Sequence, residues 1–383
     1  MTGVGFSERD ATSRMLQHLL QYHNASRVRT VCLDLSRPLA DPDAAGEGTG
    51  LGVSARVGEK GGDAVGVMYR RECHVFRHLG LALLDSDLPG RFGGPRVGGA
   101  AQAEANSQGG NKVSLLAGMV RDEEPELVID LCGHRSLLGL QVMSTLTAQG
   151  TQVISLFGHH GTVGALPANS TRSLKWTDAA ATPPEAAPLF AESLVYVGGA
   201  GAEGGGDAAT FLLNSVPDAG LIAARKAEQR RRARPHTRRE MKLPEGAVVF
   251  AYFGDLVYVD HSCWHAWMEI VRLVPGSVLW LALGNASTDT TVNVHKHALE
   301  YGLSSRRVVV AELPGQQLLT PELMSLADVM LDSTLHNTPP EYLLQALWAG
   351  VAPVTMAGAG MHQRTTASAL RSLGLGMLIG ATV

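Results

Sequence analysis

Aromatic residues are scarce in this sequence, at 5% of 383 residues, whereas glycine is abundant, with 44 residues. This balance favours parallel strands rich in leucine, valine and alanine, joined to short helices by glycine turns. No apolar run approaches the ~20 residues that a membrane span needs. The N-terminus lacks the basic-then-apolar pattern of a signal peptide. We therefore expect a chain without membrane association, located in the cytoplasm, the nucleus or both.

Cysteine is scarce too, and the four residues, Cys32, Cys73, Cys132 and Cys263, never form a CxxC pair. Three of them lie in apolar runs, a pattern typical of buried free thiols, which favours a reducing compartment. An excess of charge of one sign is also lacking, because the net charge is −4. Such a chain has no general attraction for nucleic acid, which is therefore not an expected partner.

The length exceeds one ordinary hydrophobic core, so we expect two α/β domains. We predict an N-terminal Rossmann-like lobe with Gly-rich insertions over residues 1–215, a basic connector over 216–242 and a C-terminal Rossmann-like lobe over 243–383. The connector contains the basic run Arg225–Arg239. That run is either a solvated link or a patch for acidic partners and nuclear import.

Apolar strands alternate with amphipathic helices, most densely in the second half. There, strands are predicted at AVVFAYFG, SVLWLAL, RVVVAEL, DVMLD and APVTM, and helices at Trp264–Leu273, Val294–Tyr301, Leu318–Leu326, Glu341–Ala349 and Gln363–Leu373. In the first half, strands are predicted at Val28–Leu35, Leu127–Gly133, Thr151–Gly158 and SLVYVGG, and helices at Val65–Leu84 and Leu137–Leu146. Such alternation predicts doubly wound parallel sheets, whose ligands bind at the carboxyl ends of the strands.

Several blocks of this pattern resemble a known family. LPEGAVVFAYF, VPGSVLWL, LADVMLD, ALWAGVAPVTM and the run from Arg364 to Ala369 have the order and about the spacing of the catalytic region of O-GlcNAc transferases and Spindly-type protein O-glycosyltransferases. In the first half, DLCGHRS, FGHHGTVGA and TDAAATPPE resemble further blocks of that family. The family's tetratricopeptide repeats are not in this sequence. Because Val383 follows the last predicted strand, we expect the C-terminal lobe to be truncated at its end.

The resemblance implies a GT-B fold, in which two Rossmann-like lobes face each other across a cleft that holds the donor. It implies inverting transfer of a sugar to Ser or Thr hydroxyls of intracellular proteins, with GlcNAc from UDP-GlcNAc as the expected donor and GDP-fucose as the alternative. It also implies that no metal ion or other cofactor takes part. A metal-free site neutralises the leaving diphosphate with a lysine, hydroxyl groups and a helix N-terminus.

The candidate site residues follow from the matched blocks. His134 and His159 are the candidate catalytic residues, because they follow predicted parallel strands. The candidate residues for donor binding are His160, Gly161, Thr162, Tyr258, Thr320, Asn337, Thr338, Gln345 and Arg364. The pair His261 and His265 has the spacing of zinc ligands on a helix, yet no third ligand lies close by in sequence, so no metal site is predicted.

Some of these positions depart from the family's pattern. Tyr258 stands where the resemblance places the lysine that grips the diphosphate, and Gln345 stands where it places an aspartate that holds the ribose. Pro339 and Pro340 remove two amide donors from the turn that faces the phosphates. These departures motivate a second hypothesis, a catalytically inactive GT-B scaffold that serves as a binding or regulatory module.

Overall fold

The computed structural model of the chain describes a set of separate segments. They are residues 24, 26–34, 75–78, 113–131, 133–135, 137–156, 160–164, 171–196, 237–283, 287–312 and 319–380. The chain divides into two compact units: the first is Met1–Lys175 with Ala191–Ser193, and the second is Trp176–Phe190 with Leu194–Val383. Most of the predicted connector at 216–242 lies outside the described residues, so that boundary stays a prediction.

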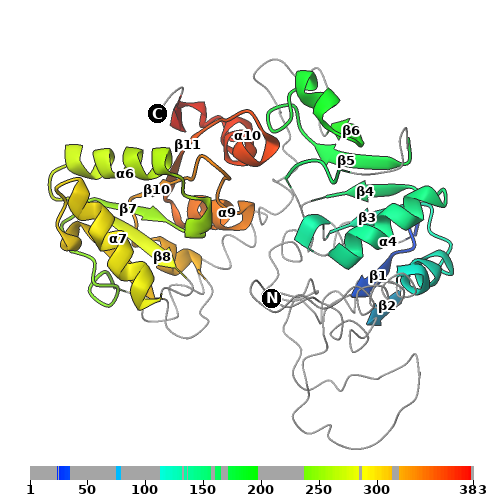
Figure 1. The fold of residues 1–383 in the computed structure, drawn as a ribbon, viewed down its shortest axis with the longest axis horizontal. Helices are drawn as coiled ribbons and strands as arrows, with labels where there is room; N and C mark the ends of the chain where they lie inside the picture. The colour runs from blue at the N-terminus through cyan, green and yellow to red at the C-terminus, as the bar shows by residue number, and fades with distance from the viewer. Residues whose placement is uncertain are drawn as a thin grey trace, which may run out of the picture. The chain divides into compact units, whose positions relative to one another are not determined.

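A six-stranded sheet forms the core of the second unit (Figure 1). Every neighbouring pair of strands in it runs parallel. In spatial order the strands are β12 (Ile379–Gly380), β11 (Ala352–Met356), β10 (Val329–Leu331), β7 (Val249–Tyr252), β8 (Val278–Leu283) and β9 (Val308–Glu312). The central strands β7 and β8 are buried along their whole length, which explains why they are continuous apolar runs rather than alternating ones.

Helices cover both faces of this sheet. Phe250 and Leu279 pack on one face against α6 (His261–Leu273) and α7 (Thr288–Glu300). Ala251 and Trp280, one residue further along the same strands, pack on the opposite face against α8 (Pro321–Met324) and α9 (Pro340–Ala349). Successive side chains of a strand point to opposite faces, so a single strand supplies both cores. The last helix, α10 (Thr365–Ser372), is buried along most of its length.

Side chains at the helix starts set where these helices begin. The carboxylate of Asp260 accepts a hydrogen bond from the backbone N–H of Cys263 at 2.8 Å and caps α6. The Ser287 hydroxyl caps α7 through Thr290, and the Thr320 hydroxyl caps α8 through Leu323. Such caps satisfy N–H groups that have no partner within the helix.

The first unit holds most of a four-stranded sheet. Its strands, in spatial order, are β3 (Val128–Asp130), β4 (Val153–Ser155), β5 (Ser173–Thr177) and β6 (Ser193–Tyr196). The pairs β3–β4 and β4–β5 run parallel. Helix α4 (Leu137–Ala148) and the helical residues 113–121 bury Val142, Leu146 and Leu116 against Val153. A separate parallel pair joins β1 (Val31–Asp34) to β2 (Val75–His78).

Two expectations are wrong, and one strand is missing from the prediction. Residues 75–78 of the predicted helix Val65–Leu84 form strand β2, so the helical interpretation fails there. Strand β5 is not predicted at all, because its sequence, SLKWT, lacks the apolar character of a buried strand. Cys32 is disulfide-bonded rather than a free thiol, whereas Cys263 is free and buried. Within the described segments, no helix has both the length and the apolar character needed to cross a bilayer.

Candidate functional site

The first polar cluster lies where β3 and β4 of the first unit end. Asp130, the last residue of β3, is 2% exposed. Its two carboxylate oxygens each lie 3.2 Å from the backbone N–H of Gly133, and Oδ2 accepts a hydrogen bond from the Ser155 hydroxyl at 3.3 Å. Gly133 begins a 3-10 turn, Gly133–Arg135, with a φ of 51°, in the left-handed region that favours glycine. Asp130 therefore fixes the turn that carries His134.

The loop 160–164 is held by a second buried carboxylate. Glu192 accepts hydrogen bonds from the backbone N–H of Val163 at 2.6 Å and from the Thr162 hydroxyl at 2.7 Å. The Thr162 hydroxyl also accepts from the backbone N–H groups of Gly164 and Ala191, both at 3.1 Å. Thr162, a candidate for donor binding, is thus committed to shaping its own loop.

The first unit brings two of the candidate residues together. Nε2 of the exposed His134 lies 3.3 Å from the backbone carbonyl oxygen of Thr162. His160 and Gly161 are partly buried in the same loop. His159, the other candidate catalytic residue, lies outside the described residues.

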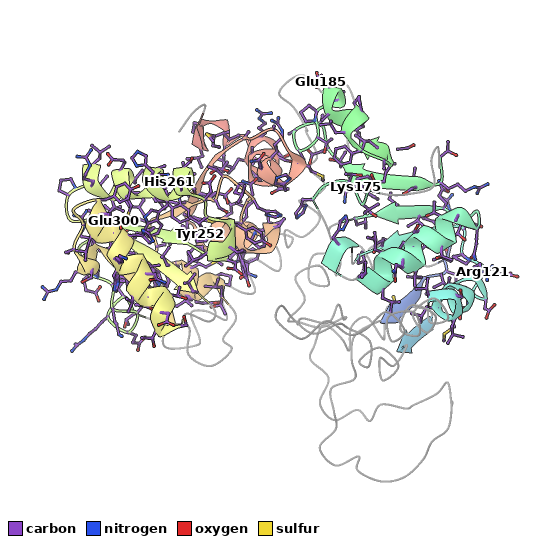
Figure 2. The ribbon with its side chains drawn as sticks, viewed as in Figure 1. Arg121, Lys175, Glu185, Tyr252, His261 and Glu300 are labelled. Carbon is purple, nitrogen blue, oxygen red and sulfur yellow. The ribbon has the colours of Figure 1, made fainter. Side chains whose placement is uncertain are left out.

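Lys175 is a polar residue of this cluster that the sequence analysis missed (Figure 2). Its side chain is 0% exposed, and Nζ donates a hydrogen bond to the carbonyl of Leu156 at 3.4 Å. Burial lowers the pKa of Lys175 to about 8, although the charges of Glu192 and Asp130 act in the opposite direction. A strand of mixed polarity such as SLKWT gives no sign that its lysine is buried, so only the fold reveals it.

The second polar cluster lies in the second unit, around the carboxyl end of β10. Asp332 directly follows this strand and is buried. It accepts hydrogen bonds from the backbone N–H groups of Ser333 at 3.0 Å and Thr338 at 2.7 Å, and from the Thr355 hydroxyl at 2.7 Å. Burial raises the pKa of Asp332, and the hydrogen bonds from Thr338 and Thr355 offset that rise in part. Asp332 thereby ties the loop after β10 to strand β11.

Two candidates for donor binding, Asn337 and Thr338, are used inside this cluster. Both are 0% exposed. Oδ1 of Asn337 accepts hydrogen bonds from the backbone N–H of Thr366 at 3.2 Å and from the Thr365 hydroxyl at 3.3 Å, while Nδ2 donates to the carbonyl of Ser333 at 3.1 Å. Asn337 therefore clamps the first turn of α10 to the loop after β10.

Tyr258 forms part of a column of three rings. Its ring centroid lies 4.6 Å from that of His336 in a stacked arrangement, and His336 lies 5.6 Å from His362. The three rings come from three loops, which follow β7, β10 and β11. Burial and the charge of His336 lower the pKa of His362. A Cβ at position 360 would lie 2.5 Å from the His362 ring, so glycine leaves this ring its place in the column.

The remaining candidates have mainly structural contacts. Arg364 donates hydrogen bonds to the carbonyls of Ala180 and Gly358, both at 2.9 Å. Burial, followed by the charge of Arg371, lowers the pKa of Arg364, yet a guanidinium keeps its charge at neutral pH. Thr320 caps α8, and Gln345 is partly buried on α9.

An open cavity of about 590 Å³ lies beside the N-terminus of α6. It is lined by Asp260, His261, Ser262, His265, Thr334, Met356, Gly358 and Gln363. Gln363 joins this cavity to the loops described above, since it donates to the carbonyl of Thr334 at 2.9 Å. Among the residues that the structure describes, no three His, Cys, Asp or Glu side chains converge as metal ligands would.

Residues 219–383 match the model of the family described as glycosyl transferase family 41. The chain is 31% identical over 146 residues to a UDP-N-acetylglucosamine–peptide N-acetylglucosaminyltransferase of Caenorhabditis elegans, covering 38% of this chain and 12% of that protein. It is 27% identical over 265 residues to the probable UDP-N-acetylglucosamine–peptide N-acetylglucosaminyltransferase SPINDLY of Arabidopsis thaliana, covering 69% of this chain and 26% of that protein. The chain therefore spans about a quarter or less of the length of these relatives.

Among solved structures, a point mutant of the Thermobaculum terrenum O-GlcNAc transferase is similar in fold. It matches with a TM-score of 0.65 at 18% identity, over 98% of this chain and 55% of that one. The α/β fold of the GT-B type is thereby confirmed, as is the resemblance to the O-GlcNAc transferase and Spindly-type catalytic region. The role of each site residue stays a prediction.

Proposed function

We propose that this chain, whose residues 219–383 match glycosyl transferase family 41, is an O-GlcNAc transferase-like glycosyltransferase that acts on protein Ser and Thr hydroxyls. The observation that carries the proposal is this family match, which covers the six-stranded sheet and its loops. The proposed reaction is inverting transfer of a sugar from a nucleotide diphosphate. UDP-GlcNAc is the proposed donor, and GDP-fucose is the alternative.

The donor is proposed to bind at the carboxyl ends of the strands in the second unit, where ligands of such sheets bind. Arg364 is the cation proposed to face the diphosphate, with its guanidinium already oriented by two carbonyls. The ring column that contains Tyr258 offers a flat surface for a nucleobase. We propose that no metal ion takes part, so that protein donors alone stabilise the leaving diphosphate.

His134 is the proposed general base for the acceptor hydroxyl. The Thr162 carbonyl can only accept a hydrogen bond, so we assign the ring proton to Nε2, which lies 3.3 Å from it. That tautomer leaves the lone pair on Nδ1. Because His134 is exposed, an acceptor hydroxyl can approach the ring and give up its proton as the bond to the sugar forms.

The second candidate function is an inactive scaffold that binds a nucleotide or a protein partner. Tyr258 in place of a lysine favours it, since a phenol does not neutralise a phosphate. The burial of Asn337 also favours it, because its side-chain amide is committed to Ser333, Thr365 and Thr366 of the protein itself. For either function we propose a cytoplasmic or nuclear location.

Calorimetric titration of the chain with UDP, UDP-GlcNAc and GDP, without added metal, tests the proposal. Micromolar binding of UDP, together with radiolabelled sugar transfer from UDP-GlcNAc to an acceptor peptide, would support the enzyme. Binding without transfer would favour the scaffold. Absence of binding by all three nucleotides would overturn the enzyme proposal.

A further inference from the structure

Tyr252 (Figure 2), the last residue of strand β7, is a buried tyrosine whose hydroxyl group contacts two loops. Its side chain is 0% exposed, and its ring packs against Trp267 of α6 with the ring centroids 4.8 Å apart. The hydroxyl oxygen lies 3.0 Å from the carbonyl oxygen of Asp255, in the loop after β7, and 3.3 Å from Oγ of Ser333, in the loop after β10. A phenylalanine could pack on the same tryptophan, so what the hydroxyl adds is the contact with the two loops.

Both contacts of this hydroxyl lead on to rings of the ring column. The Asp255 carbonyl also accepts a hydrogen bond from the backbone N–H of Tyr258, at 3.1 Å. The Ser333 hydroxyl donates a hydrogen bond to the backbone carbonyl of His336. Tyr258 in turn stacks on His336, with the ring centroids 4.6 Å apart. The two loops are therefore joined at two places, by the stacked rings and by the hydroxyl of Tyr252.

The sequence leaves room for this hydroxyl. A Cβ at position 254 would collide with the hydroxyl oxygen of Tyr252, and residue 254 is a glycine. The φ of Gly254 does not lie in the left-handed region, so the backbone conformation does not require a glycine there. Burial raises the pKa of Tyr252, so the hydroxyl keeps its proton and remains a hydrogen-bond donor at neutral pH.

Little apolar burial holds the two rings in place. Tyr258 and His336 are each only partly buried. The residue before each ring is apolar but exposed, Val257 at 69% and Leu335 at 45%. Apolar packing therefore constrains this part of the two loops weakly, which leaves a larger share to hydrogen bonds with the buried framework.

We propose that Tyr252 is a positioning residue whose hydroxyl group joins the loop after β7 to the loop after β10, and so keeps Tyr258 stacked on His336. A stack that exists before binding lowers the ordering cost for a flat ligand such as a nucleobase. The effect of Tyr252 on nucleotide binding rests on the proposed function, in which the ring column receives the nucleobase. The coupling of the two loops does not depend on it.

The NMR signal of the His336 ring protons tests this coupling without any ligand. In the full chain with isotope-labelled histidine, the ring current of Tyr258 shifts this signal, and the variant Tyr258→Leu shows its unstacked position. We expect Tyr252→Phe to move the signal towards that unstacked position, because the hydroxyl that joins the two loops is gone. The phenylalanine ring still packs on Trp267, so a loss of the core contact does not explain the shift.

A second variant and a matched control separate this coupling from a general effect of losing a hydroxyl. Ser333→Ala breaks the same connection from the other loop and should move the His336 signal in the same direction. Because Tyr252 and Ser333 act in one connection, the double variant should move the signal no further than the larger single effect. Tyr301→Phe removes a hydroxyl that lies 3.3 Å from Nδ1 of His265, outside this connection, and should leave the signal unchanged. An unchanged signal in Tyr252→Phe, or a double variant that moves it by the sum of both effects, would overturn the proposal.

Calorimetry with UDP on the same variants distinguishes this proposal from the proposed function. Tyr252→Phe should weaken UDP binding about fivefold, the effect of one lost hydrogen bond, whereas Tyr301→Phe should not weaken it. If the His336 signal moves but Tyr252→Phe binds UDP as tightly as the original chain does, the role of Tyr252 in nucleotide binding is overturned. If the original chain binds no UDP, the proposed function fails, and the His336 signal still decides whether Tyr252 couples the two loops.

Discussion

The Thr355 hydroxyl lies 2.7 Å from Oδ2 of Asp332 and joins strand β11 to the residue that follows β10. Both side chains are buried, and the same carboxylate also receives the backbone N–H of Thr338. The loop after β10 is therefore anchored to β11 through one internal acid. A nucleotide that binds here meets a preformed surface, which lowers the ordering cost of binding.

We predict that Thr355→Val lowers the free energy of unfolding by about 1–3 kcal/mol, because it removes one donor from a buried carboxylate while keeping the β-branched shape. Urea denaturation measures the change. Thr288→Val, at an exposed position of α7, is the control and should change the free energy by less than about 0.5 kcal/mol. If Thr355→Val and Thr288→Val lose the same free energy of unfolding, the contact between Thr355 and Asp332 does not stabilise the fold.

The ionisation of Asp332 should appear in the pH dependence of stability. Its pKa is raised in the folded chain, so the folded state holds this proton more tightly than the unfolded state does. Its contribution to stability is therefore full below the unfolded value of about 4 and decreases as the pH rises above it. Asp332→Asn removes this contribution, and its stability relative to the original chain should improve between pH 4 and pH 7. Urea denaturation at several pH values checks this, and a relative stability that falls over that range would contradict it.

Replacing Tyr258 by lysine restores a cation at the position where the resemblance expects one. We predict that Tyr258→Lys strengthens UDP binding by roughly tenfold, as one additional charged hydrogen bond to a phosphate would give. Calorimetry with UDP measures the gain. Tyr258→Phe keeps the stack on His336 without adding charge, so it serves as the control and should leave the affinity unchanged. If Tyr258→Lys binds UDP no more tightly than Tyr258→Phe, the diphosphate does not bind beside position 258.

Gly360→Ala should displace His362 from the ring column, because the new Cβ would lie 2.5 Å from the imidazole. The backbone φ of Gly360 is −86°, so alanine introduces no backbone strain and the effect is steric alone. Once displaced, His362 loses the burial and the neighbouring His336 that lower its pKa, so the pKa should rise towards its ordinary value. Titration of the His362 ring protons by NMR measures this pKa.

Gly246→Ala, at an exposed position where a Cβ has open space around it, is the control for a general effect of substituting glycine. An unchanged pKa would show that the ring accommodates the methyl group in place.

The sequence predicts the second unit well, because its central strands, β7 and β8, are buried on both faces and are continuous apolar runs such as VLWLAL. Strand β5 is not predicted because its sequence, SLKWT, contains polar residues, and only the fold shows that Lys175 is buried there. The ring column cannot be predicted from the sequence either. Tyr258, His336 and His362 come from three loops, and no periodicity connects them. The sequence predicts which loops follow the strands, whereas the contacts between side chains of different loops can be seen only in the folded structure.

The predicted roles of the two units lead to a test that separates binding from transfer. If His134 is the general base, His134→Gln should lower the rate of sugar transfer by a factor of about 10²–10⁴, the usual contribution of such a group. The same change should leave UDP affinity intact, because His134 belongs to the first unit while the proposed donor contacts belong to the second. Glutamine keeps an N–H that can donate to the Thr162 carbonyl, so the loop 160–164 should hold its place. Radiolabelled transfer and UDP calorimetry on the same preparation measure both quantities, with His297→Gln on the exposed face of α7 as the control. If His134→Gln binds UDP and transfers sugar at the original rate, His134 is not the general base. If His134→Gln loses both UDP binding and transfer, the ring supports the fold rather than the reaction.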